Sequence, residues 1–313
     1  MRSSILIHPE ELNKKWIDRI ADNGIGILGL HPRGGGDAVA SLAELELLFE
    51  NDTFRELIDY AVSRGLEIEY EIHAARSLLP SSLFDAHPEY FRMNERGERV
   101  PDFNLCVSSE EALDTVAKNA ATLAKKLYKS RPVYYFWLDD TLGAYCNCPR
   151  CKALSPSDQE LTAVNRMLKE IRKTVPNAKM AYLAYQDFLP IPGKIKPADG
   201  IFLEYAPFEK YRTTDPERIR AERDVMKGQM EYFGVGDSKV LEYWLDNSLF
   251  SNWKKPPVRF EANKEQVIKE IREYAALGFE SIATFGCFLG DDYETLYGEP
   301  DISSFTDGIN SLK

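Results

Sequence analysis

The sequence lacks long hydrophobic runs, an excess of positive charge and a phosphate-binding glycine loop. No apolar stretch among its 313 residues approaches the roughly 18 residues that a membrane span requires. Lysine and arginine total 39 against 50 acidic residues, and phosphate groups require clustered cations, so neither nucleic acid nor a membrane is an expected partner. The glycines at 34–36 lack the G-x-G-x-x-G spacing, so no organic cofactor is expected.

A secretory core followed by a cleavage site is also missing from the first ten residues, which contain only the short apolar run Ile5-Leu6-Ile7. We therefore expect a cytoplasmic protein, unless a signal sequence has been removed. The chain has five cysteines, and a reducing compartment favours thiols as metal ligands over disulfides.

Short apolar runs alternate with amphipathic helical patterns along the whole chain. The helical patterns include 113–127, 161–171 and 267–275, where apolar residues recur at spacings of three and four. Eight runs are typical of buried strands: 4–7, 25–30, 66–72, 133–138, 180–185, 201–205, 240–244 and 281–285. This alternation predicts an α/β protein with one (β/α)8 TIM-barrel domain over residues 1–313. A long loop is expected after the third strand, from about Ala74 to Arg131.

Acidic residues occur at the ends of several predicted strands. Asp139 and Asp140 follow the fourth strand, Glu204 lies in the sixth and Glu242 in the seventh. Active sites of such barrels lie at the carboxyl ends of the strands, and an unpaired buried charge is costly. The acids therefore point into the barrel mouth or form structural salt bridges. Two carboxylates across a glycosidic bond are what glycoside hydrolysis requires.

Histidines and aromatic residues occur at the same strand ends. His8, His31 and His73 fall at the ends of strands one, two and three, where they bind sugar hydroxyls, bind a divalent metal together with the acids, or cap the strands. Aromatic rings stack on sugar faces or fill the barrel core. The aromatic residues on or just past strand ends are Trp137, Tyr185, Tyr205, Tyr243, Trp244 and Trp253. Of these, Trp137, Tyr185, Tyr205 and Trp244 are the candidates for sugar binding.

Three cysteines form a tight cluster after the fourth strand, in Cys146-Asn147-Cys148-Pro149-Arg150-Cys151. This C-x-C-x2-C spacing is too close for a relaxed disulfide framework, but it suits tetrahedral ligation of zinc by thiolates. A zinc ion at this position fixes the loop that follows Asp140.

The order of these features resembles the bacterial domain-of-unknown-function 4838 family, which is regarded as glycosidase-like. The resemblance rests on His73, the segment His87-Pro88-Glu89-Tyr90-Phe91, Leu105-Cys106, the acid pair and the C-x-C-x2-C cluster. A looser similarity is to the family 42 β-galactosidases, in which an upstream cysteine completes a structural zinc site. It implies zinc ligation by Cys106, Cys146, Cys148 and Cys151. By the same analogy strand four supplies the acid/base and strand seven the nucleophile, although Asp139-Asp140 stands where that clan has Asn-Glu.

The sequence thus predicts a glycoside hydrolase acting on a small carbohydrate or oligosaccharide. Asp140 is expected to be the general acid/base and Glu242 the nucleophile, with Asp139 and Glu204 orienting the substrate. One alternative is a metal-dependent sugar isomerase or epimerase, with a divalent ion held by these acids and the histidines. Another is a carbohydrate-binding barrel without catalysis. The loop cations Arg76, His87, Arg96 and Arg99 suggest an anionic sugar, unless they pair with local acids.

Overall fold

The computed structural model describes residues 1–312 and contains a closed barrel of eight parallel strands. Each strand pairs with the next along the chain, and β8 pairs with β1. The strands are β1 (Arg2–Ile7), β2 (Ile27–Leu30), β3 (Glu67–His73), β4 (Val133–Trp137), β5 (Lys179–Ala184), β6 (Ile201–Tyr205), β7 (Lys239–Glu242) and β8 (Ser281–Phe285). The predicted (β/α)8 architecture is confirmed.

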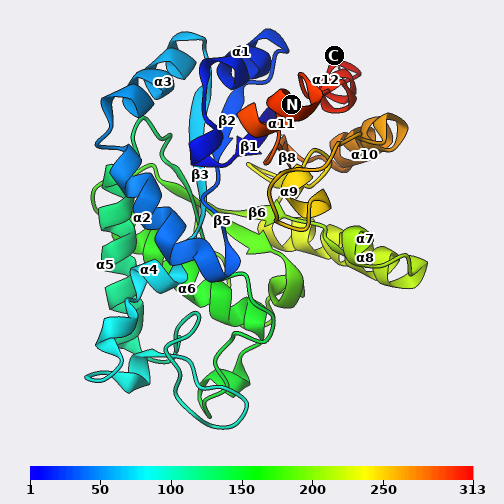
Figure 1. The fold of residues 1–313 in the computed structure, drawn as a ribbon. Helices are drawn as coiled ribbons and strands as arrows, with labels where there is room; N and C mark the ends of the chain where they lie inside the picture. Colours follow the sequence, from blue (N-terminus) through cyan, green and yellow to red (C-terminus); the bar gives the residue numbers. More distant parts are fainter. Residues whose placement is uncertain (313) are drawn as a thin grey trace.

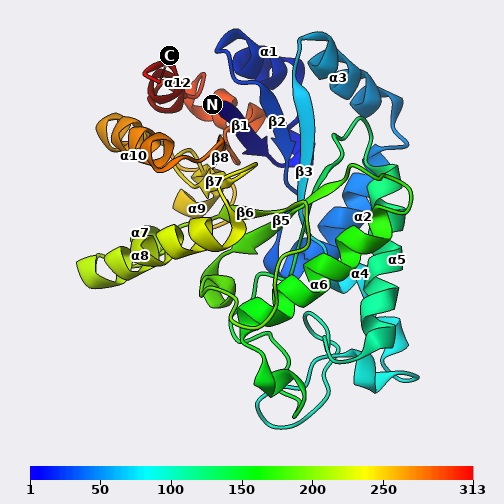
Figure 2. The same ribbon diagram turned by 180° about the vertical axis from the view of Figure 1, so that it is seen from behind.

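Helices surround the barrel, as Figures 1 and 2 show from opposite sides. They are α1 (Lys14–Asp22), α2 (Ala38–Leu48), α3 (Asp52–Ser63), α4 (Ala75–Leu78), α5 (Glu110–Lys126), α6 (Pro156–Ile171), α7 (Glu209–Arg212), α8 (Pro216–Phe233), α9 (Asn247–Phe250), α10 (Lys264–Leu277), α11 (Asp291–Tyr297) and α12 (Ser303–Asn310). None of the helices in residues 1–312 combines the length and the apolar composition that a membrane-spanning segment requires.

Local sequence signals account for where the helices begin and end. Helix α6 begins with a capping box, in which the Ser155 hydroxyl accepts from the backbone N–H of Asp158 and the Asp158 carboxylate accepts from Ser155. Helix α10 ends at Gly278, whose φ of 96° lies in the left-handed region that glycine tolerates. Helix α5 has acids in its first turn and lysines in its last, which complements the helix dipole.

Alternate strand residues face the helices and the barrel interior. The outward residues form the larger hydrophobic core with the surrounding helices, and the inward residues form a second cluster that includes Leu6, Trp137, Leu183, Leu241 and Phe285. This inner cluster is the floor on which a site at the barrel mouth is built.

The connection from β3 to β4 is the part that extends farthest from the barrel. It contains α4, short 3-10 turns at Ser81–Leu83 and Pro88–Tyr90, and then α5. The segment before α5 packs against the loop after β4, since the backbone N–H of Asn147 donates to the carbonyl of Met93 over 2.8 Å. In both ribbon views these cyan and green loops lie side by side below α5 and α6.

Candidate active site

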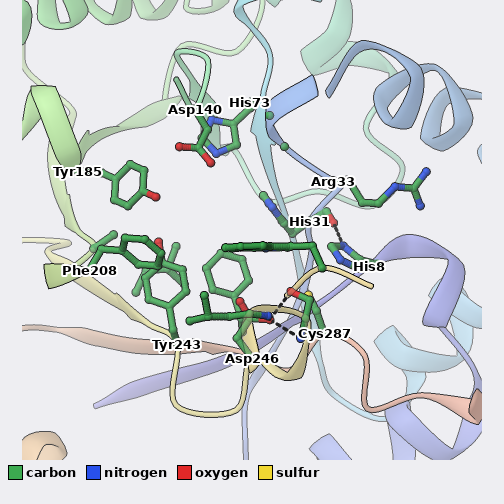
Figure 3. A pocket seen from close by; sticks show the side chains of 18 of the residues that line it. His8, His31, Arg33, His73, Asp140, Tyr185, Phe208, Tyr243, Asp246 and Cys287 are labelled. Atoms are coloured by element: carbon green, nitrogen blue, oxygen red, sulfur yellow. Dashed lines mark hydrogen bonds between the residues drawn. The ribbon is translucent and has the colours of Figure 1, made fainter. Parts of the chain in front are cut away.

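A cavity of about 310 Å³ opens at the carboxyl ends of the strands (Figure 3). This volume lies at the lower end of the range for small-molecule sites, roughly 300–1,000 Å³. Six of the residues singled out in the sequence line it: His8, His31, His73, Trp137, Asp140 and Tyr185. The structure therefore brings these six residues together, as expected for strand ends of one barrel.

The three histidines share one hydrogen-bonding arrangement. The Nδ1–H of His8 donates to the carbonyl of His31 over 2.8 Å, and that of His31 donates to the carbonyl of Glu71 over 2.8 Å. The Nδ1–H of His73 donates to the carbonyl of Leu138 over 2.6 Å. A carbonyl oxygen only accepts, so each Nδ1 carries its proton and each neutral ring presents Nε2 as an acceptor.

Burial favours the neutral form of His31 and of His8. It lowers the pKa of His31 well below the usual value, and the neighbouring His73 and His8 lower it further. Burial also lowers the pKa of His8. The ring of His31 lies 6.0 Å from both His8 and His73, so a proton on one ring is repelled by a proton on another. On this side of the cavity His8 and His31 are therefore uncharged hydrogen-bond acceptors.

An aromatic wall forms another side of the cavity. The ring of Phe208 lies 5.6 Å from Tyr185 and 4.8 Å from Tyr243, and Tyr243 lies 5.0 Å from Phe285. The ring of His31 is 5.0 Å from Phe285, which connects this wall to the histidines. Such a surface is suited to the apolar face of a sugar ring.

Asp140 projects into the cavity from the end of β4. Its Oδ1 accepts a hydrogen bond from the Gln186 side-chain amide over 3.2 Å, and the same amide donates to the Tyr185 hydroxyl over 2.7 Å. Gln186 has a φ of 48°, an unusual left-handed conformation that aims its side chain at both groups. Gln186, which follows the neighbouring strand β5, thus holds the Asp140 carboxylate in place.

Asp246 is a second carboxylate at the cavity, in the loop after β7. Figure 3 shows it across the cavity from Asp140, with Tyr185 and Tyr243 on one side of the view and His31 on the other. Its Oδ1 accepts from the Ser248 N–H over 3.1 Å, the Ser248 hydroxyl over 2.5 Å and the Leu249 N–H over 3.4 Å, and these bonds cap α9. Burial nevertheless raises the pKa of Asp246 to about 6.

Glu242, the expected nucleophile, does not line the cavity that contains Asp140. Its side chain is buried on the outer face of β7, where Oε1 accepts from Lys210 over 2.7 Å and from the Tyr274 hydroxyl over 2.6 Å. The Tyr211 hydroxyl donates to Oε2 over 3.0 Å. The pairing of Glu242 with Asp140 is therefore corrected, since strand alternation points Glu242 toward the helices.

Glu204 lies inside the barrel, below the cavity. Its Oε2 accepts from the Trp137 indole N–H over 2.8 Å, and its Oε1 lies 3.6 Å from the Lys239 ammonium. Lys239 also pairs with Glu69 and Glu71, and stands 4.2 Å from the Tyr135 ring. We call Lys239, Glu69, Glu71 and Glu204 the interior ionic cluster. Glu204 does not line the cavity, and it contributes to the site by orienting Trp137 through this hydrogen bond.

Burial raises the pKa of Glu71 well above its usual value, and the adjacent carboxylates Glu204 and Glu69 raise it further. The Lys239 cation lowers this pKa but does not cancel the increase. Burial also acts on Glu69, but the Lys239 and Arg131 cations outweigh it and lower the pKa of Glu69 overall. The cluster therefore favours the protonated form of Glu71, which limits the repulsion between its carboxylates.

Three other predicted substrate-binding residues do not line this cavity. Asp139 accepts from the Asn104 backbone N–H over 2.8 Å, and its carboxylate lies 3.5 Å from Arg76, so it ties the β3 loop to β4. Tyr205 faces outward, and its hydroxyl donates to the Glu222 carbonyl over 2.7 Å. Trp244 also faces outward and donates to Glu270 over 2.7 Å. In all three cases the side chain points away from the cavity that it was expected to line.

Arg33 is the cation at the cavity wall, and acids surround it. It forms ion pairs with Glu10, Asp37 and Glu44. The loop cations are also engaged: Arg76 donates to the Gly35 carbonyl, and Arg99 donates to the Phe91 carbonyl over 2.6 Å. None of the four loop cations proposed for an anionic sugar lines the cavity. The expectation of an anionic sugar therefore finds no support in this arrangement.

Sequence reasoning missed several cavity residues. Tyr243 and Asp246 follow β7, and their inward direction depends on the register of that strand. Gln186 gave no signal, since its function depends on an unusual backbone angle. Position 34 leaves little room for a side chain, because a Cβ on Gly34 would lie 2.8 Å from the His73 ring. The remaining residues that sequence reasoning missed at the cavity include Arg33, Asp37, Phe208, Ser248, Leu249 and Phe285.

The four predicted cysteine ligands are buried and lie together. All four Sγ atoms are within 4.8 Å of one another, and Cys106 is 3.7 Å from Cys148 and 3.8 Å from Cys151. Four thiolates at 2.3 Å from one zinc have their sulfurs about 3.8 Å apart. The thiols are free, and Met93 N–H donates to Cys146 Sγ over 3.3 Å, as donors around metal thiolates do. The donor set fits a structural zinc.

One further group of potential ligands occurs in residues 1–312, namely His8, Glu11 and Cys287. No group of three within 4.8 Å in this part of the chain contains Asp140, Glu204 or Glu242. The ligand set of the metal-dependent isomerase alternative is therefore not assembled.

A family model described as "Domain of unknown function (DUF4838)" matches residues 49–232. No curated protein sequence matches the chain. Among solved structures, the β-galactosidase of the psychrophilic Marinomonas ef1 aligns with a TM-score of 0.53 at 13% identity over 91% of this chain. The alignment spans 54% of that galactosidase, so this chain has about half its length.

Two further solved structures have the same architecture. A GH20 catalytic module of the pneumococcal exo-β-D-N-acetylglucosaminidase StrH aligns with a TM-score of 0.52 at 11% identity, over 99% of this chain and 83% of that one. The GH5 xyloglucanase of Bacteroides ovatus aligns with a TM-score of 0.50 at 12% identity, over 96% and 67%. At these identities the likeness establishes a shared barrel fold.

Proposed function

This chain belongs to the DUF4838 family, and we propose that it is a glycoside hydrolase that uses Asp140 and Asp246 as its catalytic carboxylates. One observation carries the proposal: two carboxylates from different strand ends line opposite sides of one sugar-sized cavity. Glycoside hydrolysis requires this arrangement, with an acid on one side of the scissile bond and a carboxylate on the other. The barrel fold shared with glycoside hydrolases is consistent with the proposal.

The environments of the two carboxylates suggest their roles. Asp246 is buried and its pKa is raised to about 6, so it holds a proton in mildly acidic solution and is suited to protonate the leaving oxygen. Asp140 is half-buried, with one oxygen bound by Gln186, and serves as the second carboxylate across the scissile bond. This reverses the role expected for Asp140 and replaces Glu242.

The remaining walls favour an uncharged sugar. The three histidines bond to carbonyls through Nδ1, which leaves each Nε2 for the hydroxyls of a sugar. The aromatic wall faces the ring carbons, and the cation at the wall, Arg33, is already paired with three acids. A sugar carboxylate entering this cavity would meet two aspartates without a free cation. We therefore propose a neutral sugar unit as the substrate.

We also propose that Cys106, Cys146, Cys148 and Cys151 hold one zinc ion with a structural role. When bound, the ion supplies no open coordination position and joins the segment before α5 to the loop after β4. That loop follows Asp140, so the cysteines stabilise the backbone that presents it.

The test compares Asp140→Asn and Asp246→Asn with the wild type, using a panel of neutral aryl glycosides and reducing-sugar release. Each change should lower turnover by about 10²–10⁴-fold, the usual contribution of a general acid or base. Asparagine retains the oxygen that caps α9, so Asp246→Asn is expected to fold. The exposed acid Asp224 on α8 provides the matched control as Asp224→Asn.

Glu242→Gln distinguishes the two assignments of the second carboxylate. Its partners Lys210, Tyr211 and Tyr274 lie outside the cavity, so turnover should remain within a few-fold of the wild type while the melting temperature falls. A collapse of turnover in folded Glu242→Gln, with normal turnover in Asp246→Asn, would reject the proposed pair. Sugar binding without any turnover would identify a carbohydrate-binding barrel instead.

A further inference from the structure

Trp253 stands at the cavity with most of its side chain in water. It is 66% exposed, whereas Trp16, Trp137 and Trp244 are at most 5% exposed. It lines the same cavity as Asp140 and Asp246, and it follows α9 by three residues. A large exposed ring at the opening of a polar cavity is the kind of surface that recognition sites offer to a ligand.

The backbone under Trp253 is strained. Asn252 and Trp253 have φ values of 51° and 53°, and two consecutive non-glycine residues in the left-handed region are unusual. Such a conformation has an energetic cost for a residue with a side chain, and a bulky residue in this region is a genuine outlier. Hydrogen bonds hold the turn, since Asn252 N–H donates to the Leu249 carbonyl over 3.0 Å and Trp253 N–H donates to the Ser248 carbonyl over 2.7 Å.

Packing of the ring within the protein does not account for this strain. The indole makes no ring stacking, cation–π contact or side-chain hydrogen bond with another residue of the described chain, 1–312. The turn therefore holds an apolar ring out in solvent at a conformational cost. Such strain at a ligand-binding edge is typical of positions that are fixed for a partner.

We propose that Trp253 is a stacking platform for a second sugar ring, the one on the leaving-group side of the bond cleaved. This rests on the proposed function. The residues 246–253 carry both Asp246, which protonates the leaving oxygen, and the platform, and Ser248 bonds to both ends of the segment. A cavity of about 310 Å³ takes one sugar unit, so the next ring emerges at the rim beside Trp253. The substrate class is thus a disaccharide or longer glycan whose second ring has an apolar face.

Kinetics with two substrates test the platform. The substrates are a methyl glycoside and a disaccharide that share the terminal sugar accepted by the wild type. Trp253→Ala should lower kcat/KM at least about tenfold for the disaccharide, through loss of stacking, and by less than about twofold for the methyl glycoside. Trp253→Phe should restore most of the loss. Leu47→Ala on α2, where Leu47 is 72% exposed, is the control for removing an exposed apolar side chain.

Fluorescence gives a readout that does not depend on turnover. Because Trp253 is the tryptophan with substantial exposure, it dominates the emission that acrylamide quenches. In Asp140→Asn, saturating cellotetraose, xylotetraose or chitotetraose, tested singly, should reduce quenching at least about twofold. The reduction should vanish when Trp253→Phe is added.

The outcomes separate this inference from the proposed function. Shielding of Trp253 without turnover of any glycoside would retain the platform and reject the hydrolase. Turnover with equal losses for both substrates in Trp253→Ala would retain the hydrolase and reject the platform. Absence of shielding by all three tetrasaccharides would also reject the platform.

Discussion

At the scale of single residues, Asp246 determines how the site should respond to pH. Burial raises its pKa to about 6, and the hydrogen bonds from Ser248 and Leu249 offset only part of that shift. A general acid acts only while protonated, so kcat/KM should fall as pH rises through about 6. A pH–rate profile of the wild type checks this expectation. A profile that stays level to pH 8 would show that Asp246 is not the proton donor.

The same carboxyl group affects stability. Its pKa is higher in the folded chain than in an unfolded one, so the folded state binds the proton more tightly between the two values. The contribution of Asp246 to the unfolding free energy therefore declines as pH rises from about 4 to about 6. Other buried acids titrate too, so the quantity to measure is the difference between the wild type and Asp246→Asn in urea unfolding. That difference should change over this interval and be constant above about pH 7.

At the scale of elements, the alternation of β7 shows what the sequence could and could not predict. All eight strands were predicted to within two residues at each end, because buried apolar runs separated by amphipathic helices leave few other folds. The direction of Glu242 was not predictable in this way. Lys239 faces the interior and pairs with acids from β3 and β6, whereas a lysine at a strand start is normally expected to face water. Once Lys239 is inward, Glu242 must be outward.

Site residues could be predicted where their position at the end of a strand alone determines the direction of the side chain. His8, His31 and His73 occupy equivalent places after successive strands, and all three reach the cavity. The positions of residues in the longer loops depend on turn geometry, which no local sequence pattern predicts. Trp253 and Gln186 owe their positions to left-handed backbone angles, which sequence rules assign to glycine or asparagine.

The loops joined by the four cysteines form an element whose stability should depend on metal. Removing zinc with a chelator should lower the melting temperature, and turnover should fall in parallel because the loop after Asp140 loses its anchor. Elemental analysis should find about one zinc per chain. Cys148→Ser should reproduce the effect, whereas Cys287→Ser, which lies outside the cluster, should leave the zinc content unchanged. A metal-free protein with the same melting temperature would contradict the zinc proposal.

At the scale of the whole molecule, the interior ionic cluster links three strands across the barrel. Lys239→Met would leave Glu69, Glu71 and Glu204 without their shared cation, and should lower the unfolding free energy by about 3–5 kcal/mol. The loss should be larger at pH 8 than at pH 5, because without Lys239 burial opposes ionisation of Glu71 and Glu204 in the folded chain, whereas they ionise freely in the unfolded one. Urea unfolding at the two pH values measures both effects.

Lys179→Met is the matched control for this change. Lys179 pairs with Asp237 at the surface, with side-chain exposures of 41% and 45%, and such a pair contributes at most about 1 kcal/mol. Equal losses in the two variants would show that the interior cluster has no special role in holding the barrel together.

The histidine bonds have a consequence for how the chain assembles. Each ring takes its carbonyl partner from the strand end next in order: His8 from β2, His31 from β3 and His73 from β4. If one strand paired a single residue out of step, the ring would face the helices and its carbonyl would be displaced. An intact row of histidines in the cavity therefore indicates that strands β1 to β4 are paired in the correct register. Only molecules with four correctly aligned strands display the row of acceptors, so immobilised sugar should retain those molecules and let misaligned ones pass.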